Sequence, residues 1–152
     1  MSAAADIDLA GINAELGRNA SALVAWALGL GKQAIVTTNF RPFEAVILHM
    51  VTRVQPDVPV VWMDNGYNTP ATYRYADEVA KLLKLNLKTY LPLRSRAHRE
   101  AVDGPTPAID APGHAAFTQE VKLEPFARAL RETGPEVWFT ALRATDTALR
   151  AQ

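Results

Sequence analysis

The chain has 152 residues and no cysteine, and its sixteen basic side chains balance its sixteen acidic ones. This length predicts one domain over residues 1–152, and a formal net charge of zero provides no general attraction to nucleic acid or to an anionic membrane. The lack of cysteine excludes disulfides, thiolate metal sites, iron–sulfur ligation and cysteine nucleophiles within these residues. His98 and His114 have no second ligand at metal spacing, so no metal is expected, and no cofactor is expected either.

The first 90 residues alternate between helical and strand patterns. Residues 12–30 carry apolar side chains at helical spacing, which predicts one or two surface helices, with Asn19 or Ser21 as a cap for the second half. The elements predicted after them are, in chain order, a strand over 33–40, a helix over 41–54, a strand over 59–64, a helix over 69–83 and a strand over 86–90.

The periodicity stops after this third strand and returns near the end of the chain. Proline and glycine accumulate over residues 91–122, which predicts a long loop with one short helix at 94–102. A helix over 123–133 and a fourth strand over 136–142 follow. Alternating strands and helices of these lengths predict an α/β fold with a parallel sheet.

Membrane and export signals are missing from the sequence pattern. No apolar stretch approaches the roughly twenty residues of a membrane span, and the alanine-rich N-terminus lacks the basic and apolar regions of a signal peptide. We therefore expect a cytoplasmic protein without membrane contact.

Open parallel sheets bind ligands outside the carboxyl ends of their strands, where the strand order reverses. This rule selects the segments after the first, second and fourth strands: TTNFRPFE, MDNGY and LRATDTALR.

Thr37, Thr38 and Asn39 precede a helix, whose N-terminal N–H groups favour anions. Arg143 and Arg150 carry planar guanidinium groups that suit phosphate or sulfate. Together these side chains predict a pocket for a phosphorylated ligand.

Each of these signals has a simpler structural interpretation. Asp64 could accept hydrogen bonds from a ribose hydroxyl, with Gly66 permitting close approach of the backbone, or it could only fix its own turn. The TTN segment could only cap a helix, and the two arginines could lie on a solvated face.

The same segments resemble the phosphoadenylyl-sulfate (PAPS) and adenylyl-sulfate reductase family, a part of the adenine-nucleotide α-hydrolase-like group. The Ser-Ser-Ser-Phe-Gly loop of that family corresponds to VTTNF, and its Asp-Thr-Gly-Tyr and Pro-Glu-Thr-Tyr-Arg-Phe motifs correspond to MDNGYNTPATYRYA. Its Lys-Val-Glu-Pro and Gly-Leu-Arg-Arg-Glu-Gln-Ser…Arg-Ala motifs correspond to KLEPFARAL and ALRATDTALRA. The motifs stand in the expected order over residues 24–151. The resemblance implies a doubly wound parallel sheet that is truncated at the C-terminus.

The resemblance also implies a sulfonucleotide site. The loop formed by Thr37, Thr38, Asn39 and Phe40 would surround the phosphosulfate, and Asp64 and Gly66 would lie on the ribose or adenine side. Arg143 and Arg150 would hold the anionic end. Arg41 departs from the family pattern, because a long cation replaces the glycine that approaches the phosphate through its backbone.

The implied reaction is reduction of PAPS to sulfite by a thiol donor. Members of the family attack the sulfur with a cysteine in a C-terminal Glu-Cys-Gly-Leu-His tail and are turned over by thioredoxin or glutaredoxin. The present chain has neither this tail nor the paired cysteines of the iron–sulfur branch. The chain is therefore not expected to complete the reaction alone, and thioredoxin or a thiol-supplying chain is the expected partner. Apolar surface left by the truncation would favour a homo-oligomer or a companion chain.

Other interpretations of the sequence remain open. A non-catalytic adenine-nucleotide sensor or assembly subunit would keep the pocket without turnover, and a purely structural domain would keep only the core. An ATP-pyrophosphatase of the same group ranks last, because TTNFRPF lacks the lysine and both glycines of the Ser-Gly-Gly-Lys-Asp-Ser loop.

Overall fold

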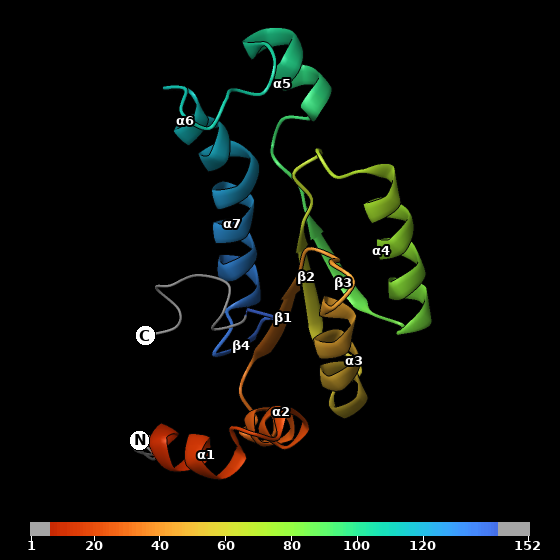
Figure 1. Ribbon diagram of the computed structural model, residues 1–152, viewed down its shortest axis with the longest axis vertical. Helices are drawn as coiled ribbons and strands as arrows, with labels where there is room; N and C mark the ends of the chain where they lie inside the picture. The colour runs from red at the N-terminus through yellow and green to blue at the C-terminus, as the bar shows by residue number, and fades with distance from the viewer. Residues whose placement is uncertain (1–6, 143–152) are drawn as a thin grey trace.

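A computed structural model describes residues 7–142 as an α/β fold built on a parallel four-stranded sheet (Figure 1). The spatial order of the strands is β3-β2-β1-β4, and every neighbouring pair is parallel. The strands are β1 (Ala34–Thr38), β2 (Pro59–Met63), β3 (Asn86–Tyr90) and β4 (Val137–Phe139). The predicted fold class is confirmed, and each strand lies within the range that its sequence pattern indicated.

Seven α-helices and one π-helical segment accompany these strands within the described residues. They are α1 (Leu9–Leu16), α2 (Ala20–Gly29), α3 (Glu44–Val54), α4 (Pro70–Leu82), α5 (Arg96–Asp103), α6 (His114–Thr118), η1 (Gln119–Leu123) and α7 (Glu124–Thr133). Several begin where a polar side chain accepts a backbone N–H group, as Asn19 does for α2 and Thr69 for α4. Within the described residues, no helix is long and apolar enough to cross a membrane.

Helices cover both faces of the sheet, as Figure 1 shows for α3 and α4 on one side and α7 on the other. Successive strand residues point to opposite faces, so Val36 and Val60 belong to one core while Ile35 and Val61 belong to the other. The first core is completed by side chains of α2, α3 and α4, and the second by Ala129 of α7. This arrangement is the doubly wound architecture that was predicted.

The direction in which successive strands are added to the sheet reverses between β1 and β4. The chain runs from β1 outward through β2 to β3, and then returns to add β4 on the opposite side of β1. The neighbouring β1 and β4 are linked near this point by the Trp138 Nε1–H group, which donates to Thr37 Oγ1 at 2.9 Å. The carboxyl ends of β1 and β4 therefore lie beside the usual ligand position of an open α/β sheet.

The prediction of one long loop over residues 91–122 is wrong in part. The short helix expected at 94–102 is present as α5, but residues 114–123 are also helical and continue directly into α7. Proline and glycine interrupt the helices only over residues 104–113, between α5 and α6. The segment HAAFTQEVKL has three large apolar residues, Phe117, Val121 and Leu123, which is too few to show a helical period. Its helical state depends on the continuation into α7 and on contacts with α5.

Candidate functional site

A polar cleft opens at the carboxyl ends of β1 and β2 and has a volume of about 410 Å³. The segments after the two strands form two of its sides, and the π-helical segment η1 forms another. The lining residues are Asn39, Phe40, Arg41, Pro42, Met63, Asn65, Asn68, Thr72, Val121 and Lys122. Two cations and three amides in one cleft can bind an anionic group together with a polar heterocycle.

The loop after β1 is organised by the carboxylate of Glu44, in the first turn of α3. Glu44 Oε2 accepts the Thr38 hydroxyl at 2.8 Å, the Asn39 N–H group at 2.6 Å and the Arg41 N–H group at 3.4 Å. The Phe40 N–H group donates to Thr38 Oγ1 at 2.9 Å, and Phe40 has a φ of 54°. The sequence analysis assigned the hydroxyl and N–H groups of this loop to a bound anion. In the structure they already donate to the carboxylate of Glu44.

This role of Glu44 was missed by the sequence analysis, although a signal for it exists. An acidic residue in the first turn of a helix is favoured by the helix dipole and can accept N–H groups that have no partner within the helix. Glu44 stands six residues after Thr38, where the loop folds back onto the helix.

The two predicted threonines point to opposite faces of the sheet, because side chains alternate along a strand. Thr38 faces the Glu44 side, whereas the Thr37 hydroxyl accepts the Trp138 indole N–H group. Both threonines are buried, and neither lines the cleft. The exposed Asn39 and the buried Phe40 do line it, so the structure brings only part of the predicted loop into contact with a ligand-sized space.

Asp64 is buried at the carboxyl end of β2 and holds the following turn. Its Oδ1 atom accepts the Gly66 N–H group at 3.0 Å, the Asn68 side-chain amide at 3.0 Å and the Tyr73 hydroxyl at 2.8 Å. Burial, followed by the hydrogen bond to Asp64, raises the pKa of the Tyr73 hydroxyl above its ordinary value. Gly66 has a φ of 80°, a conformation that favours glycine. The turn role that the sequence left open for Asp64 is thus observed.

The π-helical segment η1 brings a cation to the cleft. Lys122 and Val121 line the cleft, while Glu120 of the same turn points to α5 and binds Arg94 through two hydrogen bonds of 2.7 Å. Single π-helical turns are often found at functional sites. Lys122 was not among the predicted site residues, although it opens the KLEP motif that the sequence analysis noted.

The remaining predicted contacts cannot be placed in this geometry. Arg143 and Arg150 lie outside the described residues. Arg41, Asn65, Asn68 and Thr72 line the cleft without having been predicted. Only the tertiary structure brings these four side chains together, since they come from two loops and a helix. Within residues 7–142, no cluster of three histidine or acidic side chains is arranged to hold a metal ion.

Comparison with known protein families identifies residues 33–152 with the phosphoadenosine phosphosulfate reductase domain. A phosphoadenosine 5′-phosphosulfate reductase of Xanthomonas axonopodis pv. citri is 44% identical over 147 residues, which is 95% of this chain and 61% of that protein. A protein of the same name from Xylella fastidiosa is 42% identical over 130 residues, or 85% of this chain and 55% of that protein. The chain thus spans less than two thirds of these curated relatives.

Among solved structures, the fold is similar to a phosphoadenylyl-sulfate (PAPS) reductase from Candida auris, crystallised as a phosphate complex. The TM-score is 0.75 at 24% sequence identity, and the match covers 94% of this chain and 70% of that one. At this identity the likeness establishes the shared fold.

Proposed function

Because the chain belongs to the phosphoadenosine phosphosulfate reductase domain family, we propose that it binds an adenosine phosphosulfate nucleotide as part of sulfate assimilation. The observation that carries this proposal is the cleft at the carboxyl ends of β1 and β2, where Arg41 and Lys122 stand beside the side chains of Asn39, Asn65 and Asn68. Two cations suit the phosphosulfate, and the amides can both donate to and accept from an adenine ring or a ribose.

Each predicted site residue takes a specific part in this proposal. Asn39 and Phe40 contact the nucleotide from the β1 loop, while Thr37 and Thr38 hold that loop from behind. Asp64 and Gly66 shape the turn that presents Asn65 and Asn68 to the cleft. Arg143 and Arg150 lie outside the described residues, and their part in the proposal is to bind the anionic end of the nucleotide.

The proposed natural reaction is reduction of PAPS to sulfite and adenosine bisphosphate. A thiolate must attack the sulfur, and a second thiol must then release sulfite by forming a disulfide with the first. None of the 152 residues is a cysteine. Both thiols therefore come from outside these 152 residues, and thioredoxin or a thiol-supplying chain is the proposed partner.

A second candidate function is a nucleotide sensor or assembly subunit without turnover. It is favoured by the lack of any thiol in these residues and by the contacts of Glu44, which already satisfy the donors of the β1 loop. A nucleotide bound in such a cleft would change the position of the loop without reacting.

Calorimetric titration tests the proposal with adenylyl sulfate, PAPS, adenosine bisphosphate and magnesium ATP. We expect a sulfonucleotide to bind, and Lys122→Ala and Arg143→Ala each to weaken its binding by roughly tenfold, about 1.4 kcal/mol. Lys81→Ala is the matched control, because Lys81 is an exposed cation in the last turn of α4. Failure of all four nucleotides to bind would refute the proposed function.

A reconstitution separates the two candidates. Sulfite release from PAPS in the presence of reduced thioredoxin would favour the reductase function, whereas tight binding without any sulfite would favour the sensor.

A further inference from the structure

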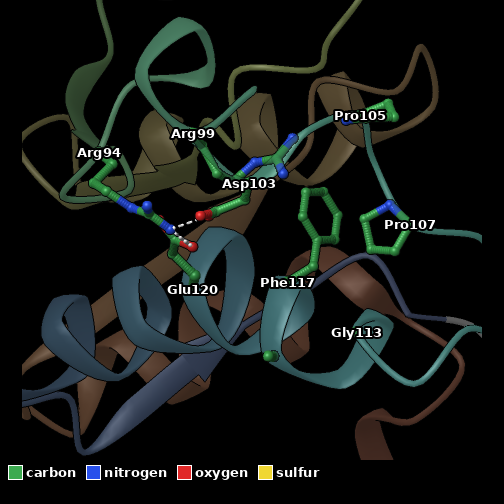
Figure 2. A pocket seen from close by; sticks show the side chains of 9 residues that line it. Arg94, Arg99, Asp103, Pro105, Pro107, Gly113, Phe117 and Glu120 are labelled. Carbon is green, nitrogen blue, oxygen red and sulfur yellow. Dashed lines mark hydrogen bonds and ion pairs between the residues drawn. The ribbon is translucent and has the colours of Figure 1, made fainter. Parts of the chain in front are cut away.

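A second cavity lies between α5 and α6 and has a volume of about 310 Å³ (Figure 2). It shares no lining residue with the polar cleft, although the two are separated by a single turn of η1, whose Glu120 borders the cavity and whose Lys122 borders the cleft. Cavities of this size with apolar walls and a few polar groups are typical small-molecule sites.

Arg99 is unusual among the residues that line this cavity, because it carries a charged guanidinium group and is only 4% exposed. It donates through Nε and Nη2 to the Tyr67 hydroxyl, and it stacks over the Phe117 ring at 4.7 Å from the centroid. A buried cation is costly unless a negative charge compensates it. A tyrosine hydroxyl and an aromatic face compensate only part of that cost.

The neighbouring carboxylates hydrogen-bond to other cations, and Asp103 and Glu120 act on Arg99 only through space. Asp103 and Glu120 both bind Arg94, at 2.6 and 2.7 Å, and in Figure 2 their side chains turn toward Arg94. Glu100 lies 3.9 Å from Arg99 and binds Arg96 at 2.8 Å. Among residues 7–142, Arg99 therefore has no carboxylate within hydrogen-bonding distance.

The Nη1 amino group of Arg99 is the part available to a ligand. It makes no hydrogen bond to any described residue, and yet no side-chain nitrogen or oxygen in this part of the chain is both fully buried and unpaired. Nη1 must therefore open onto space, and Arg99 lines the cavity beside Phe117. Nη1 and Nη2 together form the planar fork that binds an oxyanion through two parallel hydrogen bonds.

The charge and the walls of the cavity restrict the ligand. Arg94 and Arg99 are balanced by Asp103 and Glu120, so the lining is neutral. A monoanionic ligand would leave one uncompensated charge in the site and a dianionic phosphate would leave two, which favours the monoanion. The Phe117 ring lies against the guanidinium, and Pro105 and Pro107 extend the apolar wall beyond it. The geometry points to a site for a small carboxylic acid with an aromatic or aliphatic body, its carboxylate on Arg99 and its body on Phe117.

A titration of the full 152-residue chain followed by amide NMR tests this site, with benzoate as the probe and benzamide as its neutral isostere. We expect saturable shifts in residues 94–120 with benzoate and none with benzamide. Arg99→Gln should weaken benzoate by roughly tenfold, about 1.4 kcal/mol. Arg74→Gln is the control, since Arg74 is an exposed arginine of α4 that does not line the cavity, and it should change the affinity by less than about twofold.

Other outcomes would overturn the proposal. Equal shifts with benzamide would show that the negative charge of benzoate does not contribute to binding. Shifts centred on Asn39 and Lys122 would show that benzoate binds in the polar cleft. Inorganic phosphate or sulfate binding as tightly as benzoate would reduce the site to general anion attraction. If circular dichroism finds Arg99→Gln unfolded, Phe117→Leu provides the same test on the apolar wall, and unchanged benzoate affinity in it would refute the site.

This test is independent of nucleotide binding. Adenosine bisphosphate added to the benzoate-saturated chain should leave the shifts of residues 94–120 unchanged, and displacement of benzoate would show that the cavity belongs to the nucleotide site instead. Benzoate binding without nucleotide binding would refute only the proposed function.

Discussion

The sheet with its covering helices and the segment from α5 to η1 are held together by different forces. Valines of β1 and β2, with Leu48 and Val51 of α3, are fully buried in the sheet core. In the α5 to η1 segment, the two buried side chains are Arg99 and Val121, and its main links are the contacts of Arg94 with Asp103 and Glu120. Apolar burial has no charge that pH could titrate or salt could screen, while exposed ion pairs depend on both.

This difference matters because both candidate sites use the segment from α5 to η1 as a wall. A protein can loosen such a wall without unfolding, since local opening costs less where few apolar contacts form. We therefore expect the α5 to η1 segment to respond to changes that leave the sheet core intact, and the four predictions that follow test this separation.

Truncation in the sheet core should have the largest effect. Leu48 is 1% exposed, and Leu48→Ala should reduce the free energy of unfolding by about 2–5 kcal/mol, through lost burial and the cavity that remains. Val46→Ala on the same helix is the control, because Val46 is 61% exposed and its truncation should change stability by less than about 0.5 kcal/mol. Urea denaturation measures both variants, and equal losses would contradict the assignment of the core.

Loss of the Arg94 guanidinium should loosen only the segment from α5 to η1. Arg94→Gln removes three hydrogen bonds to Asp103 and Glu120 and leaves two carboxylates close together. Amide hydrogen exchange of residues 96–123 should become several-fold faster, while exchange in β1 and β2 stays unchanged. Arg96→Gln is the control, because its single ion pair with Glu100 lies on one helix. Faster exchange throughout the sheet would show that the two regions are not separable.

Acid should act on the same segment for the same reason. The pKa values of Asp103 and Glu120 lie below their ordinary values of 3.8 and 4.5, mainly because both carboxylates accept hydrogen bonds from Arg94. A lowered carboxyl pKa contributes stability that is present above the ordinary value and is lost as pH falls through the lowered one. Amide exchange of residues 96–123, after correction for the intrinsic rate, should therefore lose protection below about pH 4.5, before the sheet does. In Arg94→Gln this early acid transition should disappear.

Salt should have the smallest effect of the four. At about 1 M salt the screening length is roughly 3 Å, which weakens the partly exposed Arg94 contacts but not the sheet core. We expect slightly faster amide exchange over residues 96–123. Amide exchange in β1 and β2 and the urea midpoint should not change. An equal response of both regions would contradict the separation.

The sequence by itself determined the order and type of most elements. The strands over 86–90 and 59–64 and the helix over 69–83 are found within one residue of their predicted bounds. Residues 59–64 form a short apolar run, and residues 69–83 have a helical apolar period that begins at Pro70. Pro70 and Asn19 act as helix starts in the structure as their types suggest. The family motifs further indicated a doubly wound sheet, which the strand order confirms.

The tertiary structure decided which side chains meet. Local patterns carry no information on partners far apart in the chain, so they could not show that Lys122 would join Asn39 in one cleft. The buried guanidinium of Arg99 is the clearest case. Its position depends on Tyr67, 32 residues earlier, and on Phe117, and only packing brings the three together.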